Sequence, residues 1–315
     1  MRGSLCLFLR VAQIMTRKVH GVHAGPWLGA NTVVFGVAGA LVPIVDIITS
    51  DLLTMCSVIS TINVITLVVI CAAPHPEEPS FAASLPPRQN KMSGGSKGTY
   101  DWVSKYFVTE VVIGNMVFWL IGGKVLASSY IEDYVVDSGV VPDYDKSWAL
   151  MVIWVMIACG RFGGLYDQIQ LNQLGGAAMN PIYSHLTGWI GCGLLGGAIW
   201  AIYPKNSVCF WLAICLYGFG NGPCVGYCYD LNNRLTVASE TGMSIVMFGL
   251  NFGASLVPYI ATLVWDDTSL GWYTLPLVIM ISMTMPLPLL YLTRVFNNID
   301  KAAAGFPPNT AKDTA

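Results

Sequence analysis

Long runs of apolar residues, separated by short polar stretches, dominate this chain of 315 residues. Eight of the runs are roughly 18–26 residues long, which is the length that an α-helix needs to cross a bilayer. They begin near Ala24, Leu52, Phe107, Trp148, Leu186, Ser207, Met243 and Trp272. A spanning helix satisfies its backbone hydrogen bonds internally, so the pattern predicts an all-α polytopic membrane protein with about eight transmembrane helices.

The composition strengthens this prediction. Hydrophobic residues make up 54% of the sequence and charged residues 11%, whereas a soluble domain carries about 25% charged residues. The formal net charge is −2, so the chain has no basic field to attract nucleic acid. The expected surroundings are therefore a lipid bilayer, with no nucleic-acid partner and with the oligomeric state left open.

Lysine and arginine residues are distributed unevenly over the loops. If the N-terminus is cytoplasmic, the inner side receives thirteen of them and the outer side only Lys146 and Lys205. Lys124 then falls near the outer end of the third span, where its side chain can reach toward the acidic outer loop. By the positive-inside rule, this distribution predicts that both termini are cytoplasmic. The sequence carries no address that selects the plasma membrane or an organelle.

One long polar stretch, residues 74–105, interrupts the apolar pattern. Its richness in Pro, Ser, Gly and Lys predicts a mobile cytoplasmic linker. The linker separates residues 1–73, which hold two spans, from residues 106–297, which hold six. The polar residues 298–315 are expected to form a disordered tail.

A short motif of glycines followed by Leu-Val-Pro occurs at 36–43 and again, six spans later, at 249–258. Six spans is the period of a fold built from two six-helix halves. A resemblance to a known family rests on this repeat and on three further segments: Thr16-Arg17-Lys18-Val19-His20, Gly160-Arg161-Phe162-Gly163-Gly164 and Phe219-Gly220-Asn221-Gly222-Pro223. The chain resembles the major facilitator superfamily over about residues 16–296, most closely its fucose-permease and sodium-dependent glucose transporter branch.

This resemblance implies that the eight spans correspond to the fifth to twelfth helices of a twelve-helix transporter. A partial N-terminal bundle would then precede a complete six-helix C-terminal bundle. The implied function is secondary active transport by alternating access, with Na⁺ or H⁺ as the coupling ion and no cofactor. The four missing helices leave a second hypothesis open, in which the chain is a truncated protein that does not transport: a fragment, a receptor or an assembly partner.

Uncharged polar side chains within the spans are the candidate ligands of a solute, because amides, hydroxyls and flat rings suit a small neutral molecule such as a sugar. The residues expected to bind substrate are Asn31, Asn115, Trp119, Tyr217, Asn221, Asn251, Ser255 and Tyr259. Several of them recur every four residues and so share one face of a helix. The alternative is that these groups form hydrogen bonds between helices.

The sixth span carries two further signals. A GxxxGxxxG motif at 218–226 predicts a smooth ridge for close helix packing, and Asn221 lies on a different face. Pro223 cannot donate to the carbonyl of Phe219, which predicts a kink with a free carbonyl near the middle of the membrane. Such a helix could line a solute path or could be an ordinary packing kink.

Two charged residues within the spans have candidate roles. Glu110, one turn inside the third span, is the candidate ion-coupling residue, or else it pairs with Lys105 or Arg161. Arg161, placed at the inner end of the fourth span, resembles part of a gate that Asp167 or Glu240 could hold, or else it is a positive-inside anchor.

Catalytic and metal-binding motifs are missing from the sequence. It contains no HExxH, GxxxxGK[ST] or CxxC, and its one GxSxG match, Gly94-Gly95-Ser96-Lys97-Gly98, lies in the predicted linker. The nine cysteines lie mostly in apolar spans and are expected to act as small packing residues. We therefore expect no enzyme, no catalytic residues and no metal site.

Overall fold

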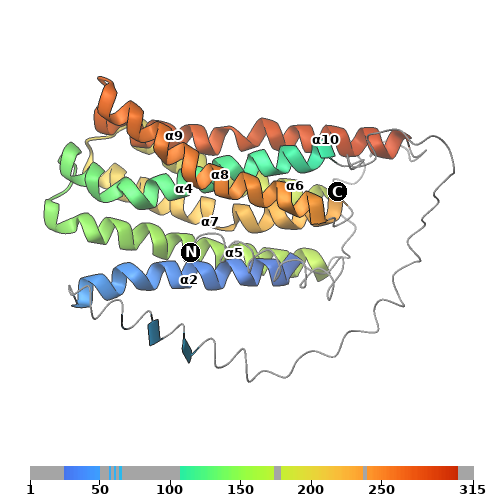
Figure 1. Ribbon diagram of the computed structural model, residues 1–315, viewed down its shortest axis with the longest axis horizontal. Helices are drawn as coiled ribbons and strands as arrows, with labels where there is room; N and C mark the ends of the chain where they lie inside the picture. The colour runs from blue at the N-terminus through green and yellow to red at the C-terminus, as the bar shows by residue number, and fades with distance from the viewer. Residues whose placement is uncertain are drawn as a thin grey trace. The chain divides into compact units, whose positions relative to one another are not determined.

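The computed structural model describes residues 25–49, 107–173, 179–236 and 240–303, together with isolated positions between 57 and 65. The chain divides into two compact units, one made of Met1–Ala40 with Tyr106–Ala315 and the other of Leu41–Lys105. The described parts of both units are mainly helical (Figure 1). The boundary between the units falls within α2 (Gly25–Thr49), the first of the described helices.

Six membrane-length segments follow in the larger unit. They are α4 (Phe107–Ser138), α5 (Lys146–Gln173), α6 (Met179–Ile202), α7 (Ser207–Leu235), α8 (Glu240–Asp267) and the successive helices α9 (Thr274–Thr284) and α10 (Pro286–Ala303). Short 3₁₀ turns, Asp143–Asp145 and Gly271–Tyr273, lead into α5 and α9. Each of the six segments is long and apolar enough to cross a membrane. The spans predicted from Phe107 onwards are therefore confirmed, and the chain is an integral, multi-pass membrane protein.

The predictions for the remaining segments have different outcomes. The first predicted span forms α2, whereas the second, near Leu52, lies almost wholly outside the described residues, so a total of eight spans stays a prediction. The linker at 74–105 also lies outside them. At the other end, α10 continues to Ala303, past the tail boundary expected at 298. The alanines at 302–304 favour helix, and the first glycine and prolines come only after them.

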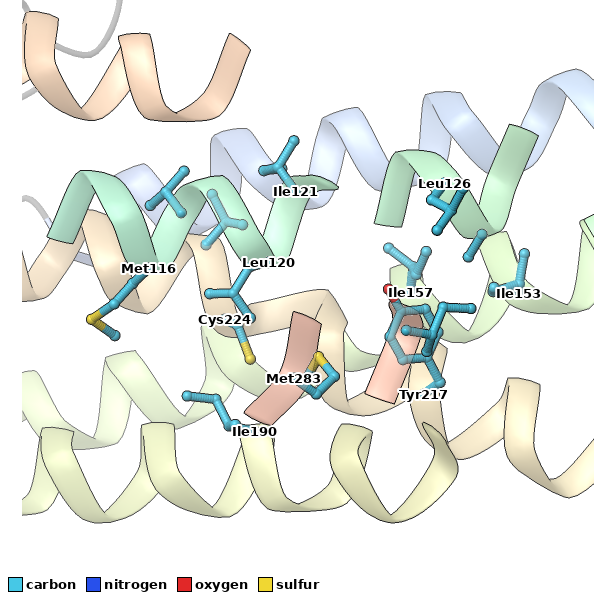
Figure 2. Packing of buried hydrophobic residues seen from close by; sticks show 14 of the residues in the cluster. Met116, Leu120, Ile121, Leu126, Ile153, Ile157, Ile190, Tyr217, Cys224 and Met283 are labelled. Carbon is cyan, nitrogen blue, oxygen red and sulfur yellow. The ribbon is translucent and has the colours of Figure 1, made fainter. Parts of the chain in front are cut away.

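Helices α4 and α7 form the centre of the six-span bundle and are its most buried members. Helix α4 packs along α8, and α7 packs between α5 and α6. Figure 2 shows side chains from five helices meeting in the core, including Met116, Leu120, Ile157, Ile190, Tyr217, Cys224 and Met283. Lipid is as apolar as this core, so close packing stabilises the bundle more than the hydrophobic effect does.

The glycine ridge of α7 is confirmed as a helix-packing surface. A Cβ on Gly218 would lie 2.8 Å from the carbonyl oxygen of Ile153, and one on Gly222 would lie 2.5 Å from that of Ile157. The backbones of α7 and α5 therefore touch, with no space for a side chain between them. On another side of α7, Gly220 lies equally close to the backbone of α6.

The glycines of the repeated Leu-Val-Pro motif also lie at helix crossings. In α2, Gly39 meets the ring of Trp154 in α5, and in α8, Gly253 meets the carbonyl of Phe118 in α4. In both copies a small residue allows a neighbouring helix to approach. Close packing is thus a physical reason for the shared glycines, whatever the origin of the repeat.

Candidate functional site

The predicted solute ligands fall into two groups in the structure. Those of α4 and α8 lie at the surface, where Asn115, Asn251, Ser255 and Tyr259 are exposed and Trp119 is half-buried. Those of α7, Tyr217 and Asn221, are buried inside the bundle. Asn31 lies in α2, but its side chain is outside the described part of the structure. The structure therefore does not bring all of the predicted residues together.

Helices α4 and α8 run side by side in the same direction. A Cβ on Gly114 would lie 3.2 Å from the carbonyl oxygen of Ile245, and two turns further on Gly122 faces Val257. Between these points the rings of Phe118 and Phe252 are in contact, with their centroids 5.7 Å apart. This contact marks one side of the helix pair.

Further residues share that side with the two rings. Asn115 is three residues before Phe118, and Ser255 is three residues after Phe252, so each lies on the same side of its helix as the ring. We call this surface the α4–α8 face, and it comprises Asn115, Phe118, Trp119, Phe248, Phe252, Ser255 and Tyr259. Asn251 lies at its edge, one turn before Ser255, and its Nδ2 donates to the carbonyl of Met247 at 2.7 Å.

The α4–α8 face combines aromatic rings with polar groups. Phe248 stacks on Phe252 with a centroid separation of 5.3 Å, and Trp119 meets Phe118 edge-on at 5.2 Å. Tyr259 is 62% exposed. Rings of this kind can cover the apolar side of a small ring-shaped solute, while the amide and hydroxyls bond to its polar groups.

Asn221 joins three helices instead of facing outward. Its Nδ2 donates to the carbonyl of Leu120 in α4 at 3.1 Å and lies 3.4 Å from the sulfur of Met283 in α9. Its Oδ1 is buried and has no hydrogen-bond partner among the described residues. In this conformation Asn221 fits the alternative of a hydrogen bond between helices.

Tyr217 and the carbonyl of Phe219 are also enclosed. A Cβ on Gly123 of α4 would lie 2.0 Å from Oγ of Ser282 and 3.2 Å from the hydroxyl of Tyr217, so this glycine allows the close packing around Tyr217. The carbonyl of Phe219, which Pro223 cannot engage, packs directly against Gly160 of α5. In this conformation α5 covers the carbonyl, which fits the alternative that this part of α7 serves helix packing.

Arg161 is not at the end of its helix. Helix α5 continues through the glycines beside it, and Arg161 lies ten residues, about 15 Å, before the end of the span at Leu171. The side chain is 3% exposed. Its Nε donates to the carbonyl of Gly222 in α7 at 3.3 Å, and its Nη1 donates to the carbonyl of Thr32 in α2. Arg161 thus ties α5 to two other helices within the larger unit.

The two proposed partners of Arg161 have other positions. Asp167 accepts hydrogen bonds from α6 and α7, and the side chain of Glu240 lies outside the described part of the structure. The gating role of Arg161 stays a prediction, and Arg161 no longer counts as a loop charge in the positive-inside comparison.

Lys124 does not extend toward an outer loop as expected. Helix α4 is 32 residues long, so Lys124 lies fourteen residues, about 21 Å, before its end at Ser138. Its side chain is 4% exposed, because it packs within the bundle. Glu110, in the first turn of α4, is also fully buried, and its ion-coupling role stays a prediction.

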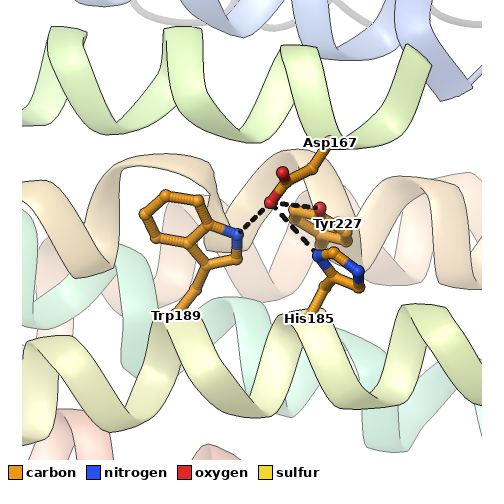
Figure 3. A network of polar contacts seen from close by, with 4 residues as sticks. All are labelled: Asp167, His185, Trp189 and Tyr227. Carbon is orange, nitrogen blue, oxygen red and sulfur yellow. Dashed lines mark hydrogen bonds and ion pairs between the residues drawn. The ribbon is translucent and has the colours of Figure 1, made fainter. Parts of the chain in front are cut away.

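A polar network at one end of the bundle was not predicted from the sequence (Figure 3). One carboxylate oxygen of Asp167 in α5, Oδ2, accepts from Trp189 Nε1 at 3.0 Å and from Tyr227 OH at 3.3 Å, and lies 3.2 Å from His185 Nδ1. Trp189 and His185 belong to α6 and Tyr227 to α7. The sequence signal was the four-residue spacing of His185 and Trp189, which places both on one face of a helix.

A second ion pair lies in the last turns of α7. Arg234 Nε donates to Asp230 Oδ1 at 3.0 Å, and both side chains are almost fully buried. The four-residue spacing of opposite charges was the signal for this pair in the sequence. Arg234 is therefore another basic residue, besides Arg161, that is buried instead of lying in an open loop.

Comparisons of the chain with protein-family models, with curated proteins and with solved structures give no match in any of the three. The resemblance to the major facilitator superfamily therefore rests on the sequence motifs alone. Among the described residues, no group of three or more His, Cys, Asp or Glu side chains is placed to hold a metal ion.

Proposed function

We propose that the chain is a secondary active transporter that moves a small, neutral, hydroxylated solute, such as a hexose, across its membrane by alternating access. The observation that carries this proposal is the α4–α8 face. It exposes an amide, two hydroxyls and several aromatic rings on the outside of a membrane-embedded bundle.

Physical chemistry favours a wet environment for this face. Amide and hydroxyl groups that point at hydrocarbon lose their hydrogen bonds to water, so polar side chains in spans usually face protein or a water-filled path. Other exposed positions of the bundle, such as Leu195 in α6 and Val208 and Leu212 in α7, are apolar, as lipid contact requires. The polar face is thus distinct from surfaces suited to lipid.

In the proposed mechanism the α4–α8 face is one wall of the solute path. In the major-facilitator interpretation the opposing wall comes from the N-terminal bundle. Solute binds between the walls, and the two bundles rock so that the path opens to one side and then to the other. Net transport follows because solute and coupling ion bind the two states with different affinity.

Uptake by proteoliposomes tests the proposal. The purified chain is reconstituted, and uptake of radiolabelled glucose, galactose and fucose is measured against protein-free vesicles. We expect saturable uptake of at least one of these sugars. Ser255→Ala should lower kcat/KM for that sugar by about tenfold, since one hydrogen bond to a polar ligand is worth about 1–1.5 kcal/mol. Leu195→Ala, on the lipid-like surface, is the matched control and should leave uptake unchanged.

A second candidate is a membrane receptor or assembly partner that does not transport. The burial of Tyr217 and Asn221 favours it, because two of the expected solute ligands are enclosed in the bundle. A receptor would bind sugar in a filter assay with detergent-solubilised protein but would show no uptake in vesicles. Saturable uptake that Ser255→Ala weakens would rule this candidate out.

A further inference from the structure

The network at Asp167 has a fixed part and a part that can change its charge. Trp189 and Tyr227 are neutral donors, and their bonds to Oδ2 hold the carboxylate in place. The third contact is from an imidazole, which gains and loses a proton within the physiological pH range. A carboxylate has no proton to donate, so Nδ1 of His185 must carry the hydrogen that lies between them.

The pair lies near the ends of its helices and is partly exposed. Asp167 lies four residues before the end of its span at Leu171, and His185 lies four residues after the start of its span at Pro181. The side chains are 25% and 41% exposed. Figure 3 shows the second ring nitrogen of His185 turned away from the carboxylate. This nitrogen, Nε2, can therefore take up a proton while the bond from Nδ1 to Asp167 stays in place.

We propose that His185 and Asp167 form the site at which this protein binds its coupling proton. The inference deepens the proposed function, on which it rests, by naming H⁺ as the coupling ion and Nε2 of His185 as the atom that receives it. The step forms one N–H bond and breaks none within the protein. It changes the charge of the pair from −1 to zero.

The charge change supplies the coupling. A lone negative charge is costly to remove from water, whereas a protonated imidazole beside a carboxylate is a neutral pair with much of that cost offset. When the ends of α5, α6 and α7 close over the network, the neutral form is therefore favoured. Proton binding thus shifts the equilibrium between the closed and open states.

Among the described residues, few other charged groups lie near His185. From α5, Asp167 faces it; from α7, Tyr227 shares the network, and Asp230 is already paired with Arg234. From α10, Arg294 interacts electrostatically with Tyr183, which lies two residues before His185. Helix α9, which also packs on α6, contains no ionisable residue.

The first test uses an imposed pH gradient. Proteoliposomes are given a difference of about one pH unit, and the accumulation of radiolabelled glucose, galactose and fucose is measured. With one proton coupled to each sugar, the gradient supports up to about tenfold accumulation, because one pH unit is worth about 1.4 kcal/mol. His185→Gln should abolish accumulation, whereas His75→Gln, the same change in the predicted linker, should not.

The second test measures the protonation of the His185 ring directly and does not depend on transport. NMR of ¹⁵N-histidine-labelled protein in nanodiscs identifies the ring of His185 as the signal lost in His185→Gln. We expect Nδ1 to stay protonated while Nε2 gains and loses its proton as the pH is varied. Asp167→Ala should release this constraint, so that the neutral ring also populates the Nε2–H tautomer.

The outcomes separate the two proposals. Sugar uptake without gradient-driven accumulation would overturn proton coupling at His185 and leave the transporter function standing. No uptake of any of the three sugars would overturn the function, and with it the coupling role. An Nε2 that does not titrate, or a ring unaffected by Asp167→Ala, would overturn the proton-binding site in either case.

Discussion

At the scale of single residues, we expect one asparagine to contribute to stability and another to solute binding. Asn221→Ala removes the bond to the carbonyl of Leu120 from a fully buried position. We expect a loss of about 1–3 kcal/mol in the free energy of unfolding, because a buried acceptor then has one partner fewer.

Asn115→Ala, on the exposed α4–α8 face, should leave the melting temperature within a degree or two while it lowers sugar uptake. Thermal unfolding in detergent, run beside the uptake assay, measures both effects; equal stability losses in the two variants would contradict this division.

The sequence identified both asparagines as polar groups in spans but did not show which one faces inward. In a soluble helix the polar side marks the surface, but a membrane helix is apolar on its lipid side and on its packed side. The direction of Asn115, Asn221 and Lys124 is therefore set by neighbouring helices, which the sequence does not display. The network of Asp167 was missed for the same reason, since it joins residues of three helices.

At the scale of elements, the close crossing of α5 and α7 should tolerate no added side chain. Gly222→Ala would place a methyl group 2.5 Å from the carbonyl oxygen of Ile157. Separating the helices to admit it should cost about 1–3 kcal/mol. Gly191→Ala in α6 is the matched control, because its Cβ would meet nothing within 4 Å. There the change should be neutral or slightly stabilising, since alanine favours helix over glycine. The melting temperatures of the two variants test this prediction. Equal values would contradict the close contact between α5 and α7 at Gly222.

The lengths of the apolar runs predicted the existence of the helices well and their ends poorly. Hydrocarbon thickness sets a minimum length for each run, so six spans could be read directly from the sequence. Real helices continue into the polar layers at the membrane surface, where their residues need not be apolar. Helix α6 accordingly begins at Met179, seven residues before the expected Leu186, and α5 continues twelve residues beyond Arg161.

At the scale of the whole molecule, two contacts link the turns between helices at one end of the six-span bundle. Tyr134 of α4 donates to the carbonyl of Pro204 in the α6–α7 turn at 2.7 Å. Lys205 of the same turn lies 5.7 Å from the ring centre of Trp272, which precedes α9. The start of α5 belongs to this end, and the network of Asp167 lies near the other end of α5. The positive-inside prediction makes the first end external and the second cytoplasmic.

Cysteine labelling in intact cells tests this orientation. Asp143 precedes α5 and Gln173 is its last residue, and both are exposed. The 28 residues of α5 span about 42 Å, which exceeds the hydrocarbon thickness of about 30 Å, so the two positions must lie on opposite sides of the membrane. A membrane-impermeant maleimide should therefore label Asp143→Cys in intact cells and Gln173→Cys only after permeabilisation, with the unsubstituted chain as the background. The reverse pattern would invert the topology, and it would place the proposed proton site on the external face. Labelling of both positions in intact cells would show that α5 does not cross the membrane at all.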